Sequence, residues 1–182
     1  MKKVYLLLAD GFEDIEAMTP VDVLRRCGAD IKTVSISDKR EVTSSHHVEV
    51  KADLTQKNSD INDGDMIILP GGFPGYENLG NSKEVGSIVK KYYDDKKYVG
   101  AICGAPTVLA KNSIAKDKKL TCHTGVKDKM AGYNYVGGDT VIDGNLITGV
   151  GAGHSLDFAL LLASILVDND TLNKVKKGME IR

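Results

Sequence analysis

Residues 98–110 read YVGAICGAPTVLA, a short apolar run that ends on a cysteine and passes at once into small residues. The pattern predicts a buried strand over residues 98–102 and a helix over residues 106–111. A reactive side chain on such a tight strand-to-helix turn forms a nucleophile elbow. Because peptide dipoles at a helix N-terminus favour negative charge, we expect the pKa of Cys103 to lie below the value of about 8.5 of an ordinary thiol. The alternative interpretation is a small buried hydrophobic residue, since free cysteine is among the most buried residue types.

Apolar runs rich in β-branched residues alternate with helical patterns along the chain, which predicts a layered α/β domain. Fully apolar runs are typical of a mostly parallel central sheet that is covered on both faces. No linker or repeat interrupts the pattern, so we expect residues 1–182 to form one domain. The predicted strands are residues 4–9, 32–37, 65–69, 98–102 and 119–122, with a late hairpin of 140–142 and 146–149 around Asp143-Gly144-Asn145. The predicted helices are residues 15–27, 83–95, 106–111, 126–130 and 155–168.

Two residues predict details of the helices. Pro20 lies inside the helix predicted over residues 15–27, and its missing N–H should either kink that helix or restart it with Thr19 as a cap. Ser155 is expected to cap the helix over residues 155–168, where Asp157 in the first turn suits the helix dipole.

The composition is typical of a globular protein and argues against several classes of partner. Hydrophobic residues make up 42% of the chain and charged residues 27%, and the formal net charge is −1. No basic stripe with interleaved aromatic residues is present, so we expect no nucleic-acid partner. The longest apolar stretch, residues 158–167, is too short to span a bilayer, so we expect no membrane partner. The short N-terminal apolar run does not resemble a signal peptide, and three cysteines without metal-ligand spacing favour reduced thiols, a cytoplasmic location and no metal site.

Distinctive residues directly follow four of the predicted strands, in residues 10–16, 70–75, 103–104 and 151–154. Because ligands of an open parallel sheet bind beyond the carboxyl ends of its strands, we expect these loops to converge on one rim. Gly71 and Gly72 are consistent with a simple tight turn. They are equally consistent with an oxyanion hole in which the backbone N–H groups of Gly72 and Gly104 hold a developing negative charge. No GxGxxG or GK[ST] pattern is present, so a phosphate loop is disfavoured and no cofactor is expected.

Glu16 is the candidate acid beside Cys103. It lies in a cluster with Glu13 and Asp14, and such clusters are usually solvated first turns of helices. The three acids point in different directions about a helix, so one of them can face the rim while the others face water. A carboxyl group beside a thiolate is pushed toward its protonated form by desolvation and like charge. Glu16 could then donate a hydrogen bond to the sulfur or move a proton.

The four histidines differ in what the sequence predicts for them. His123, after the strand over residues 119–122, is either a hydrogen-bonded structural residue or the imidazole partner of a catalytic cysteine. His46 and His47 fall in a polar, hairpin-like segment and are expected to be exposed. His154 lies where the last helix begins, and the sequence assigns it no role. Cys122 is expected to be buried and inert, and Cys27 offers no chemical argument.

Five segments, in this order and spacing, resemble the ThiJ/PfpI family over essentially the whole chain. They read LADGFEDIEAMTPVDVLRRCGAD (8–30), DMIILPGGFPG (65–75), VGAICGAPTVLA (99–110), CHTGVKDKM (122–130) and GAGHSLDFAL (151–160). The resemblance implies a flavodoxin-like three-layer sandwich that forms a homodimer. It also implies that Cys103 is the nucleophile, Glu16 the acid and His123 the nearby histidine. The oxyanion glycine of the family falls on Gly72, beside Gly71, with Gly104 after the nucleophile.

Members of this family are described as glyoxalases that need neither metal nor glutathione, as deglycases, and as oxidation-sensing chaperones. The resemblance therefore implies a cysteine-dependent enzyme acting on small aldehydes such as methylglyoxal, or on early glycation adducts, during oxidative or carbonyl stress. The alternative is a redox-sensing chaperone without turnover, in which Cys103 is oxidised to sulfinic acid beside a protonated Glu16. The family's peptidases place a histidine where this chain has Gly104, and no histidine here forms the His-x-Glu pair of the related amidotransferases. Both hydrolytic interpretations are weakened accordingly.

Overall fold

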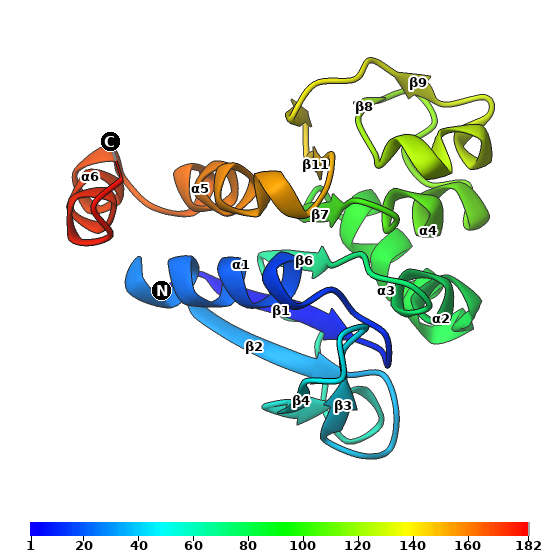
Figure 1. Cartoon of the computed structure of the whole chain (residues 1–182), viewed down its shortest axis with the longest axis horizontal. Coiled ribbons are helices and arrows are strands. Elements are labelled where there is room, and N and C mark those ends of the chain that lie inside the picture. Colours follow the sequence, from blue (N-terminus) through cyan, green and yellow to red (C-terminus); the bar gives the residue numbers. More distant parts are fainter. Residues whose placement is uncertain (182) are drawn as a thin grey trace.

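A computed structural model describes residues 1–181 and has a seven-stranded sheet at its centre (Figure 1). Six strands run parallel, and one edge strand, β10, runs antiparallel to its neighbour. The sheet order is β10 (Thr140–Asp143), β11 (Leu146–Gly149), β7 (Tyr98–Ile102), β6 (Met66–Leu69), β1 (Lys3–Leu8), β2 (Asp30–Ser35) and β5 (Leu54–Thr55). The order β2-β1-β6-β7-β11 is the flavodoxin-like doubly wound order. The predicted α/β sandwich with a mostly parallel sheet is therefore confirmed.

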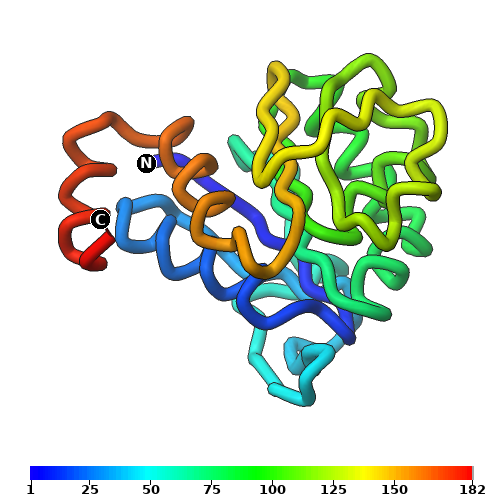
Figure 2. The backbone as a smooth tube through the Cα atoms, turned by 45° about the horizontal axis from the view of Figure 1, so that its top comes forward, coloured from blue at the N-terminus to red at the C-terminus, as the bar shows by residue number. Residues whose placement is uncertain are grey.

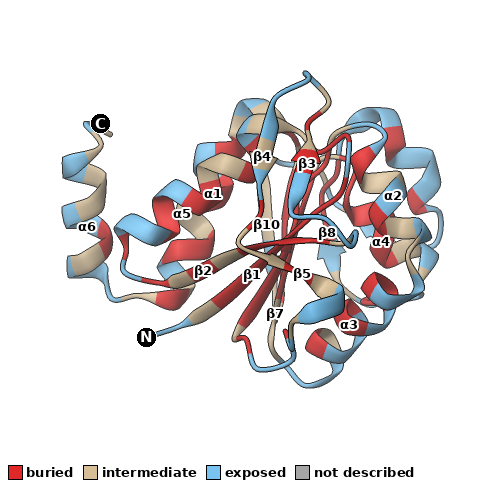
Figure 3. Cartoon of the chain, turned by 90° about the horizontal axis from the view of Figure 1, so that it is seen from below, coloured by how far each residue is buried: buried red, intermediate tan, exposed pale blue. Residues whose placement is uncertain are grey.

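Helices cover both faces of this sheet, which Figure 3 shows as a buried layer between two helical layers. One face carries α1 (Asp14–Arg26) and α5 (Ser155–Leu166), which pack against each other. The other face carries α2 (Gly75–Asn81), α3 (Lys83–Asp94) and α4 (Pro106–Lys111). The last helix, α6 (Asn169–Gly178), lies at the same end of the molecule as the start of the chain (Figure 2).

Strand β1 shows how the sequence builds two hydrophobic cores from one sheet. Successive side chains of a strand point to opposite faces. Tyr5 and Leu7 accordingly join the core beneath α2, α3 and α4, whereas Val4, Leu6 and Leu8 join the core beneath α1 and α5. Because both faces are covered, the strand has no polar face, which explains its continuous apolar pattern.

The remaining strands form two small ribbons outside the main sheet. The hairpin of β3 (Glu41–Thr43) and β4 (Glu49–Lys51) lies beside the loop after β1. The pair of β8 (Lys119–Leu120) and β9 (Asn134–Tyr135) flanks a 3₁₀ helix at Thr124–Met130. Within residues 1–181, no helix has the length and apolar character needed to cross a bilayer.

Several local predictions differ from the structure. The predicted restart of the first helix at Thr19 is wrong, because one continuous helix runs through Pro20 and is capped by Glu13 instead. Ser155 does not cap α5, because it is the first helical residue and its hydroxyl donates to the carbonyl of Ala152 at 2.9 Å.

The bounds of other elements also differ. The last predicted helix ends at Leu166, and Asp168 caps the separate helix α6, which was not predicted. The glycine-containing α2 and the short β3, β4, β5 and β9 were not predicted either. The predicted strand over residues 119–122 is shorter, and the helix predicted over 126–130 is part of a longer 3₁₀ helix.

Candidate active site

Cys103 lies at a strained turn between β7 and α4. Its backbone φ is +62°, a left-handed value that non-glycine residues adopt uncommonly and that costs on the order of 1–3 kcal/mol. The Cys103 N–H donates to the carbonyl of Gly149 at 2.9 Å, and the Cys103 carbonyl accepts from the N–H of His123 at 2.9 Å. Neighbouring segments therefore hold the turn in place, and the predicted elbow geometry is present.

Glu16 reaches this turn from the first helix. It lies in the first turn of α1 and is fully buried, whereas Glu13 and Asp14 are partly exposed. Glu16 Oε2 accepts the N–H of Gly71 at 2.9 Å, and Oε1 has no hydrogen-bond partner of good geometry among the residues that the structure describes. Burial raises the pKa of Glu16 to about 7, and Glu13 adds to the rise, while Cys103 and the Gly71 N–H oppose it. The prediction that one acid of the cluster turns inward, with a raised pKa, is confirmed.

The pKa of Cys103 differs from the prediction. Burial and the negative charge of Glu16 raise the pKa of this thiol to about 12, whereas the N–H groups of Gly104 and Gly72 oppose the rise. The expectation that a helix N-terminus would lower this pKa is therefore wrong. Cys103 stands two residues before Ala105, the N-cap of a helix of only six residues. Burial and the neighbouring Glu16 therefore outweigh the effect of the helix dipole on this pKa. Cys103 and Glu16 are neighbouring acids, so they lose their protons as a coupled pair.

The two glycines after β6 allow the backbone to approach both acids. A Cβ on Gly71 would lie 2.5 Å from Glu16 Oε2 and 2.7 Å from the Cβ of Cys103. Gly72 has a φ of +90°, and a Cβ there would lie 2.3 Å from the backbone nitrogen of Glu13. The N–H of Gly72 opposes the rise in the pKa of Cys103, so the turn is consistent both with simple chain reversal and with an oxyanion donor.

We expect Gly71→Ala to lower the free energy of unfolding by about 1–3 kcal/mol, because the added methyl group has no room. Urea unfolding followed by circular dichroism measures this change. Gly153→Ala is the matched control, since nothing lies within 4 Å of a Cβ at that position. Equal stability of the two variants would contradict the close packing described for Gly71.

His123 has a structural role and lies beside Cys103. Its Nδ1 accepts the N–H of Gly125 at 3.0 Å and so caps the 3₁₀ helix Thr124–Met130. A neutral ring that accepts at Nδ1 carries its proton on Nε2. The ring also lies close to Cys103. A Cβ on Gly151 would be 3.6 Å from the Cδ2 atom of His123 and 4.0 Å from the sulfur of Cys103.

A pocket of about 570 Å³ is lined by four of the candidate residues, Cys103, Glu16, His123 and Gly72, whereas Gly71 and Gly104 are not among its lining residues. The four loops that follow β1, β6, β7 and β11 all contribute to its wall, as predicted. The structure adds His46 from the β3–β4 hairpin, which sequence reasoning did not place in the site, and it includes His154 from the loop after β11, to which the sequence assigned no role. The lining residues are Glu13, Glu16, His46, Gly72, Cys103, His123, Thr124, Val150, Gly151, Ala152, Gly153 and His154.

The remaining cysteines are buried, and His154 has carboxylate partners. Cys122 is fully buried, as predicted, and burial raises its pKa. Cys27 is buried at the end of α1. His154 Nδ1 bonds Asp157 Oδ2 at 3.0 Å, and its Nε2 lies 3.5 Å from Asp139 Oδ1.

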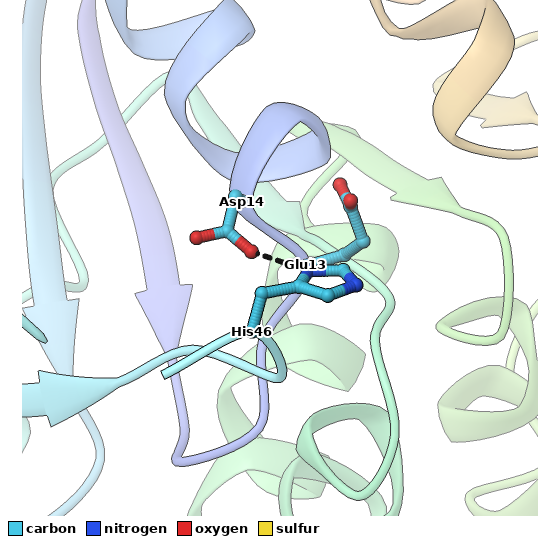
Figure 4. Close-up of side chains that lie close together, drawn as sticks. All are labelled: Glu13, Asp14 and His46. Atoms are coloured by element: carbon cyan, nitrogen blue, oxygen red, sulfur yellow. Dashed lines mark hydrogen bonds and ion pairs between the residues drawn. The ribbon is translucent and has the colours of Figure 1, made fainter. Parts of the chain in front are cut away.

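Three side chains at the pocket mouth have the atom types of a metal site. Donor atoms of Glu13, Asp14 and His46 lie within 4.8 Å of one another (Figure 4). Each already has a protein partner: Glu13 Oε2 accepts the N–H of Glu16 at 2.8 Å, and Asp14 Oδ2 bonds His46 Nδ1 at 2.7 Å. The group also lies at the N-terminus of α1, where the helix dipole disfavours a cation. These contacts account for the cluster without an ion.

Comparisons with known proteins identify the family of the chain. The sequence profile of the DJ-1/PfpI family matches residues 2–165. The Parkinson disease protein 7 homolog of Danio rerio is 35% identical over 185 residues, which cover 100% of this chain and 98% of the relative. The Glutathione-independent glyoxalase DJ-1 of Schizosaccharomyces pombe is 32% identical over 191 residues, which cover 100% of both proteins. The crystal structure of Drosophila melanogaster DJ-1beta superimposes with a TM-score of 0.96 at 33% identity, covering 100% of this chain and 98% of that one. The chain therefore belongs to the DJ-1/PfpI family.

Proposed function

We propose that the chain is a cysteine-dependent, cofactor-independent glyoxalase or deglycase that defends the cell against oxidative or carbonyl stress. Its substrates are dicarbonyls such as methylglyoxal, or their early adducts with amines and thiols. The observation that carries this proposal is the coupled pair of Cys103 and buried Glu16, which opens onto a pocket beside two backbone N–H donors. The name of the fission yeast relative, a glutathione-independent glyoxalase, supports the same chemistry.

The reactive form of the pair is a Cys103 thiolate beside a protonated Glu16. This form has the same total charge as a thiol beside a Glu16 carboxylate, so it is reached by moving one proton between neighbours. The N–H groups of Gly72 and Gly104 favour negative charge on the sulfur. A proton on the unpartnered Oε1 gives Glu16 a donor that can face the sulfur.

In the first half of the reaction, the Cys103 sulfur attacks the aldehyde carbon and forms a hemithioacetal. The N–H groups of Gly72 and Gly104 hold its oxygen, to which Glu16 gives its proton. Glu16 then takes the proton from the hemithioacetal carbon and returns it to the adjacent carbon through an enediol, while the hydroxyl proton passes from the first substrate oxygen to the second. The Nε2–H of His123 can hydrogen-bond the second oxygen of the substrate. The product of this half is a thioester of a 2-hydroxy acid on Cys103, which water hydrolyses in the second half.

Incubation of the purified protein with methylglyoxal tests the proposal. We expect lactate to form without glutathione and in the presence of a chelator, and kcat/KM to rise as the pH passes about 7, where the coupled pair loses its first proton. Failure to form lactate would contradict the proposal. Two oxygens added to Cys103 by mild peroxide, without any consumption of dicarbonyl, would favour the redox-sensor alternative instead.

We further propose a single domain and a cytoplasmic homodimer. Helices from both ends of the sequence, α1 and α5, share one face of one sheet, which supports a single domain.

Three exposed apolar side chains lie near the starts of α1 and α5 and on the β3–β4 hairpin, and such side chains favour association. They are Ile15, Leu156 and Val48. The three free cysteines are consistent with a reducing compartment. Sedimentation velocity that shows monomers alone would contradict the dimer.

A further inference from the structure

His46 is held at a fixed place on the pocket wall although its side chain is exposed. It lies in the turn between β3 and β4, and this hairpin is bonded to the loop after β1. The N–H of Ser45 donates to the carbonyl of Phe12 at 2.8 Å, and the N–H of Thr43 donates to Asp10 Oδ1 at 2.9 Å. The backbone that carries His46 is therefore fixed relative to the loop that leads into Glu16.

The ring of His46 is oriented by a carboxylate. Its Nδ1 lies 2.7 Å from Asp14 Oδ2 (Figure 4). The hydroxyl of Ser45 is farther from Nδ1, at 3.4 Å. Burial raises the pKa of Asp14, but hydrogen bonds from Ser44 and His46 lower it below its usual value. The Asp14 side chain is therefore an ionised acceptor at neutral pH. Nδ1 must then donate, which leaves a free lone pair on Nε2 in the neutral ring. A carboxylate that fixes the tautomer in this way is how a histidine is prepared to act as a base.

Two of the three pocket histidines, His46 and His123, therefore have opposite tautomers. His123 accepts at Nδ1 and presents a proton on Nε2, so its neutral ring can donate to a substrate oxygen. His46 donates at Nδ1 and presents a lone pair on Nε2, so its neutral ring can accept a proton. Glu16 is fully buried beside the sulfur, whereas His46 stands on the side of the pocket that meets solvent.

We infer that His46 is the general base for the second half of the proposed reaction, oriented by Asp14. This inference rests on the proposed function. Nε2 of His46 takes a proton from a water molecule whose oxygen attacks the thioester carbon. The C–O bond forms, the bond between that carbon and the Cys103 sulfur breaks, and the sulfur leaves as a thiolate. The products are the 2-hydroxy acid and the original thiolate, with the proton on the imidazole.

Neighbouring charges stabilise the imidazolium that forms. Asp14 already contacts Nδ1, and the carboxylate of Glu13 lies within the same 4.8 Å cluster. The N-terminus of α1 opposes a positive charge, whereas the carboxylates of Asp14 and Glu13 favour it. Besides Cys103, the other titratable side chains that line the pocket with His46 and Glu13 are Glu16, His123 and His154.

The experiment separates formation of the thioester from its hydrolysis. His46→Gln and Asp14→Asn are compared with the parent protein and with His47→Gln, a matched control because His47 is equally exposed but does not line the pocket. Each protein is incubated with methylglyoxal and freed of excess reagent, and its adduct is followed by mass spectrometry. Hydroxylamine then converts a thioester on Cys103 to a hydroxamate, whereas a hemithioacetal gives none.

We expect His46→Gln to lower the hydrolysis rate by about 10²-fold and to accumulate the hydroxylamine-sensitive adduct. Added imidazole should restore hydrolysis, which a merely structural role for His46 would not permit. Asp14→Asn should slow the same step, and His47→Gln should behave as the parent does. If the parent forms lactate and His46→Gln releases it equally fast without an adduct, the assignment of His46 is wrong. If the parent forms no lactate, the proposed function fails, and this assignment fails with it.

Discussion

Replacing Cys103 by alanine lowers kcat/KM for methylglyoxal by at least about 10⁴-fold, because no other group in the pocket can form the covalent adduct. The fold should persist, since β7 and α4 are held by backbone hydrogen bonds and by buried neighbours that do not require the sulfur. Lactate formation, measured at saturating and at limiting methylglyoxal, gives kcat and kcat/KM separately. Both should fall together, because the adduct precedes every later step.

Cys27→Ala is the matched control for this experiment. Cys27 is also a buried cysteine, but it lies at the C-terminal end of α1 and does not line the pocket. This variant should retain the activity of the parent, although its stability will fall because a buried side chain becomes smaller. A Cys103→Ala protein that keeps more than about a hundredth of the parent's activity would exclude Cys103 as the nucleophile.

The sequence of the elbow was sufficient to predict the position of Cys103 but not its protonation. Strand, turn and helix are local patterns, and the turn lies where residues 98–110 place it. The pKa of the sulfur depends instead on burial and on a carboxylate that is distant in sequence. A local argument from the helix dipole omits both contributions, and here they are the larger ones.

The role of His46 in the site also could not be predicted from the sequence. Its sequence surroundings predicted exposure, which is confirmed, but nothing local connects it with Asp14 or with Cys103. The connection is tertiary, because the β3–β4 hairpin docks on the loop after β1. Similarly, Pro20 stays within one helix because the buried packing of α1 on α5 outweighs a missing hydrogen bond.

Replacing Glu16 by glutamine should lower kcat by about 10²–10⁴-fold, because an amide cannot pass a proton between the substrate carbons. Glutamine is nearly isosteric, and its carbonyl oxygen can still accept the N–H of Gly71. The adduct with Cys103 should therefore still form, but it should remain a hemithioacetal and yield no hydroxamate with hydroxylamine. Glu41→Gln, at an exposed position on β3, is the control that should leave the activity unchanged.

The same substitution should make the protein more stable above neutral pH. The pKa of Glu16 rises from 4.5 to about 7 on folding, chiefly through burial, so the folded state binds more protons than the unfolded state between these two values. The free energy of unfolding of the parent must then fall as the pH rises through this window, by about 3 kcal/mol from this group. Glutamine has no proton to lose. Urea unfolding should therefore show that the free energy of unfolding of Glu16→Gln rises relative to that of the parent, by a similar amount, between pH 4.5 and about pH 8. Parallel pH profiles for Glu16→Gln and the parent would mean that Glu16 is not a buried acid with a raised pKa, and its role as the proton carrier would be lost.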